Sequence, residues 1–172
     1  MDKLVREWIT TVLDHHPSVL AIAIRQRAKF EGWLKSELAA HAEQQGALAV
    51  QVEASFTNVT LNLCRSDITF YYDDKRYDVE LKTPNSNWRI PGVLNTTRPI
   101  TQNIDEIIND GKKLKGSGGV GIIAFVLFPV PTQDRQWIKY LERIATSLSI
   151  PLSQIDHSSR LAVSLGGGTV RM

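Results

Sequence analysis

The sequence predicts an α/β fold in which a mixed central sheet is flanked by helices. Residues 68–81 alternate apolar and polar side chains on both sides of a polar turn, which is typical of a β-hairpin. Residues 120–130 form a continuous apolar run, which favours a strand buried on both faces in the middle of a sheet. Helical periodicity occupies most of the chain before, between and after these segments. Helices and strands therefore alternate, as in an α/β protein.

The composition is that of one globular domain. The 172 residues are 42% hydrophobic and 22% charged, which argues against disorder. A net charge of +2 neither requires nor excludes a nucleic-acid partner. Cys64 is the sole cysteine, so an internal disulfide is impossible and a reducing, cytoplasmic setting is expected. The longest apolar run is too short to span a bilayer, and the first residues lack the apolar core of a signal peptide, so no membrane association is expected.

Two helices are predicted at the start of the chain. The first covers residues 1–14 and carries one apolar stripe. After a corner at His15, His16 and Pro17, the second begins near Ser18 and continues to about residue 45. Its apolar face consists of Leu20, Ile24, Ala28, Leu34, Leu38 and Ala42.

Glu31 lies in the middle of that apolar face. A carboxylate in such a place is costly unless it is paired, hydrogen-bonded or bound to a metal. Arg27 and Lys35 are four residues away on either side, so an ion pair within the helix is one explanation. Glu37 lies further round the helix, where water could reach it.

Residues 47–63 are predicted to form one or two strands that join the hairpin in a meander of at least three strands. A turn centred on residues 74 and 75 would place Asp67 opposite Lys82 and Thr69 opposite Glu80, all on one face. Two carboxylates this close repel each other unless a cation or a proton lies between them. Oxygen ligands of this kind suit Mg²⁺. The alternative is a solvated hairpin face with alternating charges.

The set Asp67 … Glu80-Leu81-Lys82 resembles the motif of the PD-(D/E)xK nucleases, the restriction-endonuclease-like superfamily. Ser66 stands where the proline of that motif is usually written. The predicted order of elements also agrees with the superfamily's core, which is a helix, a three-strand meander, a helix and a strand.

The resemblance implies a single nuclease-like domain over residues 1–172. Its restriction-endonuclease-like core would cover about residues 18–130. Residues 1–14 would add an N-terminal helix, and residues 132–172 a C-terminal helix and strand.

The resemblance also implies a metal-dependent endonuclease that hydrolyses phosphodiesters in DNA, with Mg²⁺ as the cofactor and Mn²⁺ as a substitute. Lys82 would position the attacking water. The metal would be held by Asp67, Glu80, the backbone carbonyl of Leu81, and Glu31. Many similar nucleases pair to cut both strands, so a homodimer is a further expectation. The alternative is a catalytically inactive DNA-binding or protein-interaction module of the same fold.

Two assignments within this site stay open. The first helix of the superfamily core often brings a third acidic residue to the metal, and Glu31 is the first candidate with Glu37 the second. Asp78 shares the face of the hairpin and could substitute for one ligand.

The segment after the hairpin is a loop rich in Asn and Pro. Its Trp88 could stack on a base, and Arg89 and Arg98 could meet phosphates. The alternative for Trp88 is that it covers the core.

The rest of the chain completes the α/β pattern. Residues 101–115 are predicted to form a helix whose end carries Lys112, Lys113 and Lys115, either as a solvated end or as contacts to a DNA backbone. A last helix begins after Thr132, and a closing strand covers residues 161–165.

Overall fold

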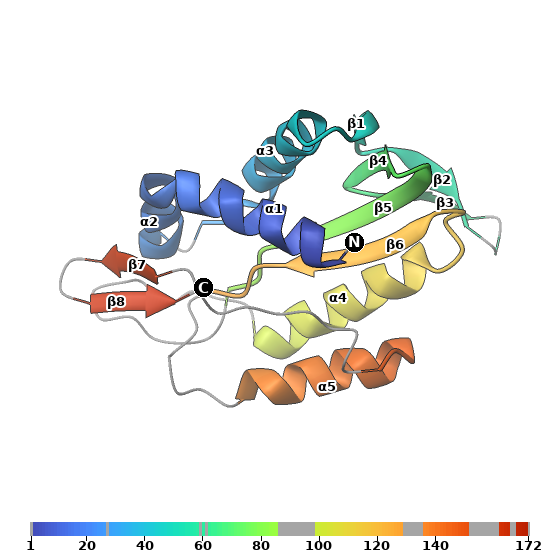
Figure 1. Ribbon diagram of the computed structural model, residues 1–172. Helices are drawn as coiled ribbons and strands as arrows, with labels where there is room; N and C mark the ends of the chain where they lie inside the picture. Colours follow the sequence, from blue (N-terminus) through green and yellow to red (C-terminus); the bar gives the residue numbers. More distant parts are fainter. Residues whose placement is uncertain are drawn as a thin grey trace.

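The computed structural model describes residues 2–26, 28–58, 60, 62–85, 99–128, 136–151, 162–165 and 168–171. A four-stranded sheet with the order β1-β4-β5-β6 forms its centre (Figure 1). β4 is antiparallel to both β1 and β5, whereas β5 and β6 are parallel, so the sheet is mixed as predicted. The strands are β1 (Leu48–Val52), β4 (Ile68–Tyr72), β5 (Lys75–Lys82) and β6 (Val120–Phe125).

Helices cover both faces of this sheet (Figure 1). α1 and α3 lie on one face, and α4 and α5 lie on the other, while α2 connects α1 to α3 at the side. The bounds are α1 (Asp2–His15), α2 (Pro17–Gln26), α3 (Glu31–Gln44), α4 (Ile100–Leu114) and α5 (Gln136–Leu148). No helix in the described ranges is long and apolar enough to cross a bilayer.

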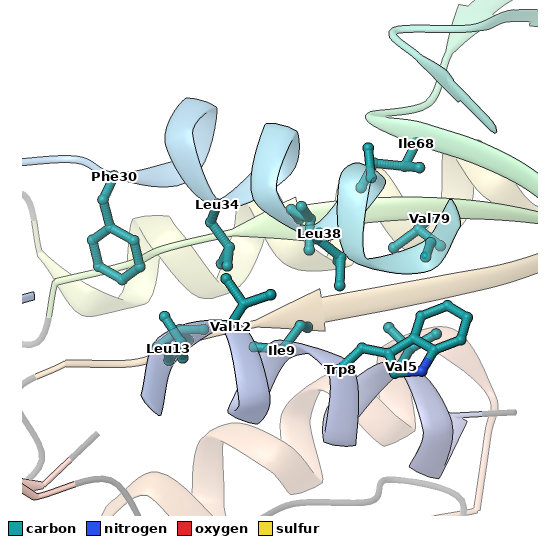
Figure 2. Packing of buried hydrophobic residues seen from close by; sticks show 14 of the residues in the cluster. Val5, Trp8, Ile9, Val12, Leu13, Phe30, Leu34, Leu38, Ile68 and Val79 are labelled. Carbon is teal, nitrogen blue, oxygen red and sulfur yellow. The ribbon is translucent and has the colours of Figure 1, made fainter. Parts of the chain in front are cut away.

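The main core lies between the sheet and helices α1 and α3 (Figure 2). The apolar half of the predicted alternation points into it, and its members are Ile68, Phe70, Tyr77, Val79 and Leu81. Each such side chain is 5% exposed or less, and burying one stabilises the fold by about 1.5–3 kcal/mol. The opposite side chains of the same strands therefore face α4.

The second predicted helix is divided in two, so the prediction of one helix from Ser18 to about residue 45 is wrong. α2 ends at Gln26 and α3 begins at Glu31. Between them, Phe30 leaves the helical conformation and packs its ring 5.0 Å from that of Phe128 in the core. This contact explains the break, which no proline or glycine marks. Glu31 consequently opens a helix rather than sitting within one, and its side chain is 30% exposed.

The hairpin has a different register from the one predicted. Tyr72 pairs with Lys75, and the turn consists of Asp73 and Asp74, both with positive φ (50° and 58°). Two left-handed residues give the turn the twist that antiparallel strands favour. The predicted pairings of Asp67 with Lys82 and of Thr69 with Glu80 are wrong by two residues. Because the shift is even, every side chain keeps its predicted face.

Among the described strands β6 is at the edge of the sheet and not in the middle as predicted. Its side chains nevertheless pack on both faces, with Ile122 in the main core and Ile123 against a second apolar cluster on α4 and α5. Coverage by helices on both sides, and not a central place in the sheet, accounts for its continuous apolar run.

Two hairpins lie outside the central sheet. β2 (Ser55–Thr57) pairs with β3 (Leu63–Arg65) and continues the antiparallel ribbon of β1 and β4. The closing strand is confirmed as β7 (Ala162–Leu165), and β8 (Gly168–Arg171) pairs with it where only a tail was predicted.

Candidate functional site

Asp67 and Glu80 lie level with each other where β4 begins, with Glu80 on the face of the sheet that carries α4 and Asp67 between the Leu81 amide and Lys35 of α3. Ile68 pairs with Val79, which brings the residues just outside that pair, Asp67 and Glu80, level with each other. Asp67 Oδ2 accepts a hydrogen bond of 2.8 Å from the backbone N–H of Leu81. This bond is possible because β4 begins at Ile68 and leaves the Leu81 amide without a strand partner on that side.

The backbone carbonyl of Leu81 has the direction that the predicted ligand set requires. In an extended strand the N–H and C=O of one residue point to the same side, and those of the next residue point to the other side. The N–H of Leu81 points to Asp67, whereas the carbonyl of Lys82 accepts a bond of 2.8 Å from Val126 on the β6 side. The Leu81 carbonyl is therefore directed toward the Asp67 side of β5.

Glu80 is the most buried carboxylate of this site, with 3% of its surface exposed. Burial raises its pKa to about 7, the nearby charges of Asp67 and Asp110 add to the effect, and Lys113 opposes it. Glu80 Oε1 makes no well-aligned hydrogen bond, and its ion-pair partner is the ammonium of Lys113 on α4. A buried carboxylate that contacts one ammonium among the described residues is poised to take a proton or a second cation.

Lys82 projects from the same face and is held between two carboxylates. Its Nζ lies 2.9 Å from Asp110 Oδ2 and 3.9 Å from Glu31 Oε1. Burial alone would lower the pKa of Lys82, but the hydrogen bond to Asp110 and the surrounding carboxylates outweigh burial and raise it. Lys82 is therefore a fixed ammonium that can orient a water or stabilise negative charge.

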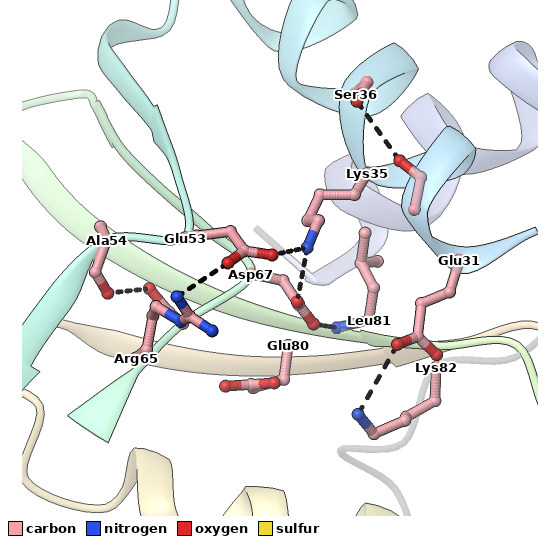
Figure 3. Close-up of polar contacts among 12 residues, drawn as sticks. Glu31, Lys35, Ser36, Glu53, Ala54, Arg65, Asp67, Glu80, Leu81 and Lys82 are labelled. Carbon is pink, nitrogen blue, oxygen red and sulfur yellow. Dashed lines mark hydrogen bonds and ion pairs between the residues drawn. The ribbon is translucent and has the colours of Figure 1, made fainter.

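Glu31, from the first turn of α3, approaches the end of β5 (Figure 3). Its Oε2 accepts a bond of 3.2 Å from the backbone N–H of Thr83, and its Oε1 faces Lys82. Glu37 lies elsewhere, 3.6 Å from His16, and its side chain is 40% exposed. The structure thus brings Glu31 to the predicted site and leaves Glu37 outside it.

Lys35 lies one turn beyond Glu31 on α3 and reaches Asp67 (Figure 3). Its Nζ is 3.3 Å from Asp67 Oδ1 and is hydrogen-bonded to Glu53, which also pairs with Arg65 at 3.0 Å. Burial would lower the pKa of Lys35, but the bond to Glu53 and the charge of Asp67 outweigh burial and raise it. Lys35 is therefore the cation that balances Asp67.

Asp78, the predicted substitute ligand, has one carboxylate oxygen held by other side chains, while its Oδ2 is buried without a hydrogen-bond partner among the described residues. Its surface is fully buried, and its Oδ1 accepts bonds from Thr69 at 2.7 Å and from Arg76 at 2.9 Å. Thr69 Oγ1 in turn lies 2.7 Å from Ser66 Oγ. This buried chain ties the start of β4 to β5 directly behind Asp67, so it positions Asp67 without reaching it.

Five charged residues of this site were not predicted as members of it: Lys35, Glu53, Arg65, Asp110 and Lys113. Asp110 and Lys113 lie three residues apart on the side of α4 that faces the sheet, with Lys113 Nζ 3.3 Å from Asp110 Oδ1. From the sequence, Lys113 was expected as part of a solvated helix end or as a contact to a DNA backbone, and Asp110 was not singled out. Trp88, Arg89 and Arg98, predicted to bind nucleic acid, lie outside the described residues.

The residues present fit a hard divalent ion through two carboxylates rather than three. Within the described ranges, no three Asp, Glu, His or Cys side chains gather closely enough to hold a metal. Mg²⁺ usually takes one or two protein carboxylates and keeps several waters. Asp67 and Glu80, with the Leu81 carbonyl directed toward them, supply such a set. Glu31 contacts Thr83 and Lys82 beside this set, so its side chain would have to turn to join it.

Comparisons with known proteins identify no relative of this chain. No protein-family model matches the chain, and no curated protein or solved structure is significantly similar to it.

Proposed function

We propose that this protein is a metal-dependent phosphodiester hydrolase acting on DNA, built on a restriction-endonuclease-like core. The observation that carries the proposal is the pair Asp67 and Glu80, level with each other across β4 and β5 and near the ammonium of Lys82. The order α3, β1, β4, β5, α4, β6 supports the proposed core, with β2 and β3 extending the ribbon between β1 and β4.

The residues divide the chemistry between them. Asp67, Glu80 and the Leu81 carbonyl would hold Mg²⁺, which when bound would activate water and polarise the phosphate. Lys82, kept charged and fixed by Asp110, would orient the attacking water and offset charge that builds on the phosphate. Glu31 would keep Lys82 and the end of β5 in place, or enter the metal shell directly. DNA is the proposed partner, with a homodimer as the form that would cut both strands.

A non-catalytic DNA-binding or protein-interaction module is the second candidate. The observation in its favour is that both central carboxylates already have cationic partners, Lys35 for Asp67 and Lys113 for Glu80. A charge network that is complete without a metal could serve stability alone. Metal binding separates the two candidates.

The test is cleavage of a plasmid with Mg²⁺ or Mn²⁺ by the parent and by four variants. Asp67→Asn and Lys82→Met should lose activity at least about a hundredfold, since each removes a group proposed to act on metal or water. Glu31→Gln should lose less, and Glu37→Gln should match the parent because Glu37 lies outside the site. Thermal melting of each variant verifies that it folds.

Two results would contradict the proposal. If folded Asp67→Asn and Lys82→Met cleave as well as the parent, the assignment of the site is wrong. If the parent neither cleaves nor shows a rise in Tm with millimolar Mg²⁺, Mn²⁺ or Ca²⁺, the non-catalytic module is correct.

A further inference from the structure

Asp67 and Glu80, the two central carboxylates, each contact one lysine, and the two lysines come from helices on opposite faces of the sheet. Lys35 comes from α3 and contacts Asp67, while Lys113 comes from α4 and contacts Glu80. Each lysine also contacts a second carboxylate further from the centre. Glu53 is that outer partner for Lys35, and Asp110 is that outer partner for Lys113.

These contacts form two adjoining sets of ion pairs, one around Lys35 and one around Lys113, which meet where the charge of Asp67 acts on Glu80; together we call them the ion-pair network. Among the described residues it contains five carboxylates and four basic side chains, so its formal charge is −1 when all are ionised. A divalent ion would change that charge to +1, the complement of one phosphodiester group. The members are Glu31, Lys35, Glu53, Arg65, Asp67, Glu80, Lys82, Asp110 and Lys113.

We propose that Lys35 and Lys113 occupy the place of the divalent ion in the metal-free protein and move onto the substrate phosphate when the ion binds. This inference rests on the proposed function, and it assigns two phosphate-binding residues that the nuclease motif does not include. Asp67 and Glu80 are the carboxylates that exchange one cation for another.

The outer carboxylates, Asp110 and Glu53, keep the displaced ammonium groups close to the site. When Lys113 leaves Glu80, Asp110 still holds its ammonium, because Lys113 Nζ is already 3.3 Å from Asp110 Oδ1. Glu53 holds Lys35 in the same way after its contact with Asp67 is lost. A lysine has a flexible four-carbon stem and a compact charge, so a shift of a few ångströms needs no backbone movement.

Asp110 also sets where Lys113 can go. Its other oxygen, Oδ2, lies 2.9 Å from Lys82 Nζ, so one carboxylate keeps both ammonium groups on the same side of the site. A displaced Lys113 therefore stays next to Lys82, where a metal-bound phosphate would lie. Two ammonium groups on one phosphate stabilise the negative charge that grows during hydrolysis.

The test compares Lys113→Met with Lys112→Met, its exposed neighbour on the same helix. Calorimetry measures the Kd for Mn²⁺ without DNA. Fluorescence anisotropy then measures the Kd for a labelled DNA duplex in Ca²⁺, which should fill the site without supporting turnover. Lys113→Met should bind Mn²⁺ about tenfold more tightly, because no ammonium competes for Glu80, and should bind the duplex about tenfold more weakly.

The opposite signs of the two effects distinguish exchange from a structural role. Lys112→Met should leave Mn²⁺ affinity unchanged and shows how much duplex affinity is lost with any one positive charge on α4. Lys113→Arg should restore parental behaviour in both measurements. Lys35→Met should repeat the result of Lys113→Met from the other face, which keeps the test valid if one variant fails to fold.

Equal or weaker Mn²⁺ binding by folded Lys113→Met and Lys35→Met would overturn the exchange and leave the proposed nuclease intact. The same holds if Mn²⁺ binding tightens but duplex binding falls no further than in Lys112→Met. If the parent itself binds no Mn²⁺ at millimolar concentration, both the exchange and the proposed function are wrong.

Discussion

Glu80→Gln tests how much folding stability the protein loses when the buried Glu80 carboxylate ionises, and it needs no assay of function. The pKa of Glu80 is about 7 in the folded protein, against 4.5 for an ordinary glutamate. A carboxyl group whose pKa is raised on folding contributes stability that is fully present below about pH 4.5 and is lost as pH rises through 7. Glutamine has nearly the shape of the protonated acid and does not ionise, so the variant should escape this loss.

The magnitude follows from the two pKa values. One pKa unit corresponds to about 1.4 kcal/mol. Between pH 5 and pH 8 the parent should therefore lose about 2–3 kcal/mol relative to Glu80→Gln, most of it before pH 7. For a chain of this length such a difference moves Tm by roughly 5–10 °C. Urea unfolding with a metal chelator, repeated at each pH, measures it.

Glu53→Gln is the matched control with the opposite sign. Its hydrogen bond and charge contact with Lys35 lower the pKa of Glu53. This carboxylate therefore stabilises the fold above its unfolded pKa, and the effect is lost as pH falls through the folded pKa. The variant should be less stable than the parent at pH 8 and equal to it in acid. If Glu80→Gln and the parent instead lose stability in parallel from pH 5 to 8, the argument from burial is wrong.

Two further predictions concern backbone packing and the buried hydrogen bonds. Gly119→Ala should lower stability in urea by about 1–3 kcal/mol, because its Cβ would lie 2.9 Å from the carbonyl oxygen of Arg76. Gly32→Ala in α3, whose Cβ would meet nothing within 4 Å, should raise stability by about 0.5 kcal/mol. Thr69→Val should cost about 1–3 kcal/mol through its lost bond to Asp78. Thr57→Val, on the exposed side of β2, should change stability by less than about 0.5 kcal/mol, and equal losses in the two threonine variants would contradict the role of the buried chain.

Periodicity predicted which elements exist better than where they begin and end. The alternation over residues 68–81 placed every side chain of the hairpin on its correct face, although the pairing was shifted by two residues. The shift could not be predicted because Asp73 and Asp74 adopt positive φ without the glycine or asparagine that usually marks such a turn. The break before Glu31 was hidden for a similar reason, since a tertiary contact of Phe30 causes it.

Only those residues of the candidate site that lie close together in the sequence could be predicted. Asp67, Glu80 and Lys82 belong to one hairpin, so strand geometry alone brings them together. Lys113 and Asp110 reach the same place from a helix about thirty residues later, and nothing near them in the sequence identifies Glu80 or Lys82 as a partner. Which charges neutralise a carboxylate pair depends on tertiary packing, which no local pattern contains.

The two-residue turn at Asp73 and Asp74 also limits which changes of length the chain can accept. Side chains alternate between faces along a strand, so one inserted residue in this turn would shift the pairing of β4 with β5 by one residue unless a β-bulge absorbed it. The tip of the neighbouring ribbon, between Thr57 and Leu63, joins strands that lie outside the central sheet. Insertions or deletions at that tip should leave the pairing of β4 with β5 unchanged. The number of residues can therefore vary more freely at the ribbon tip than in the turn between β4 and β5.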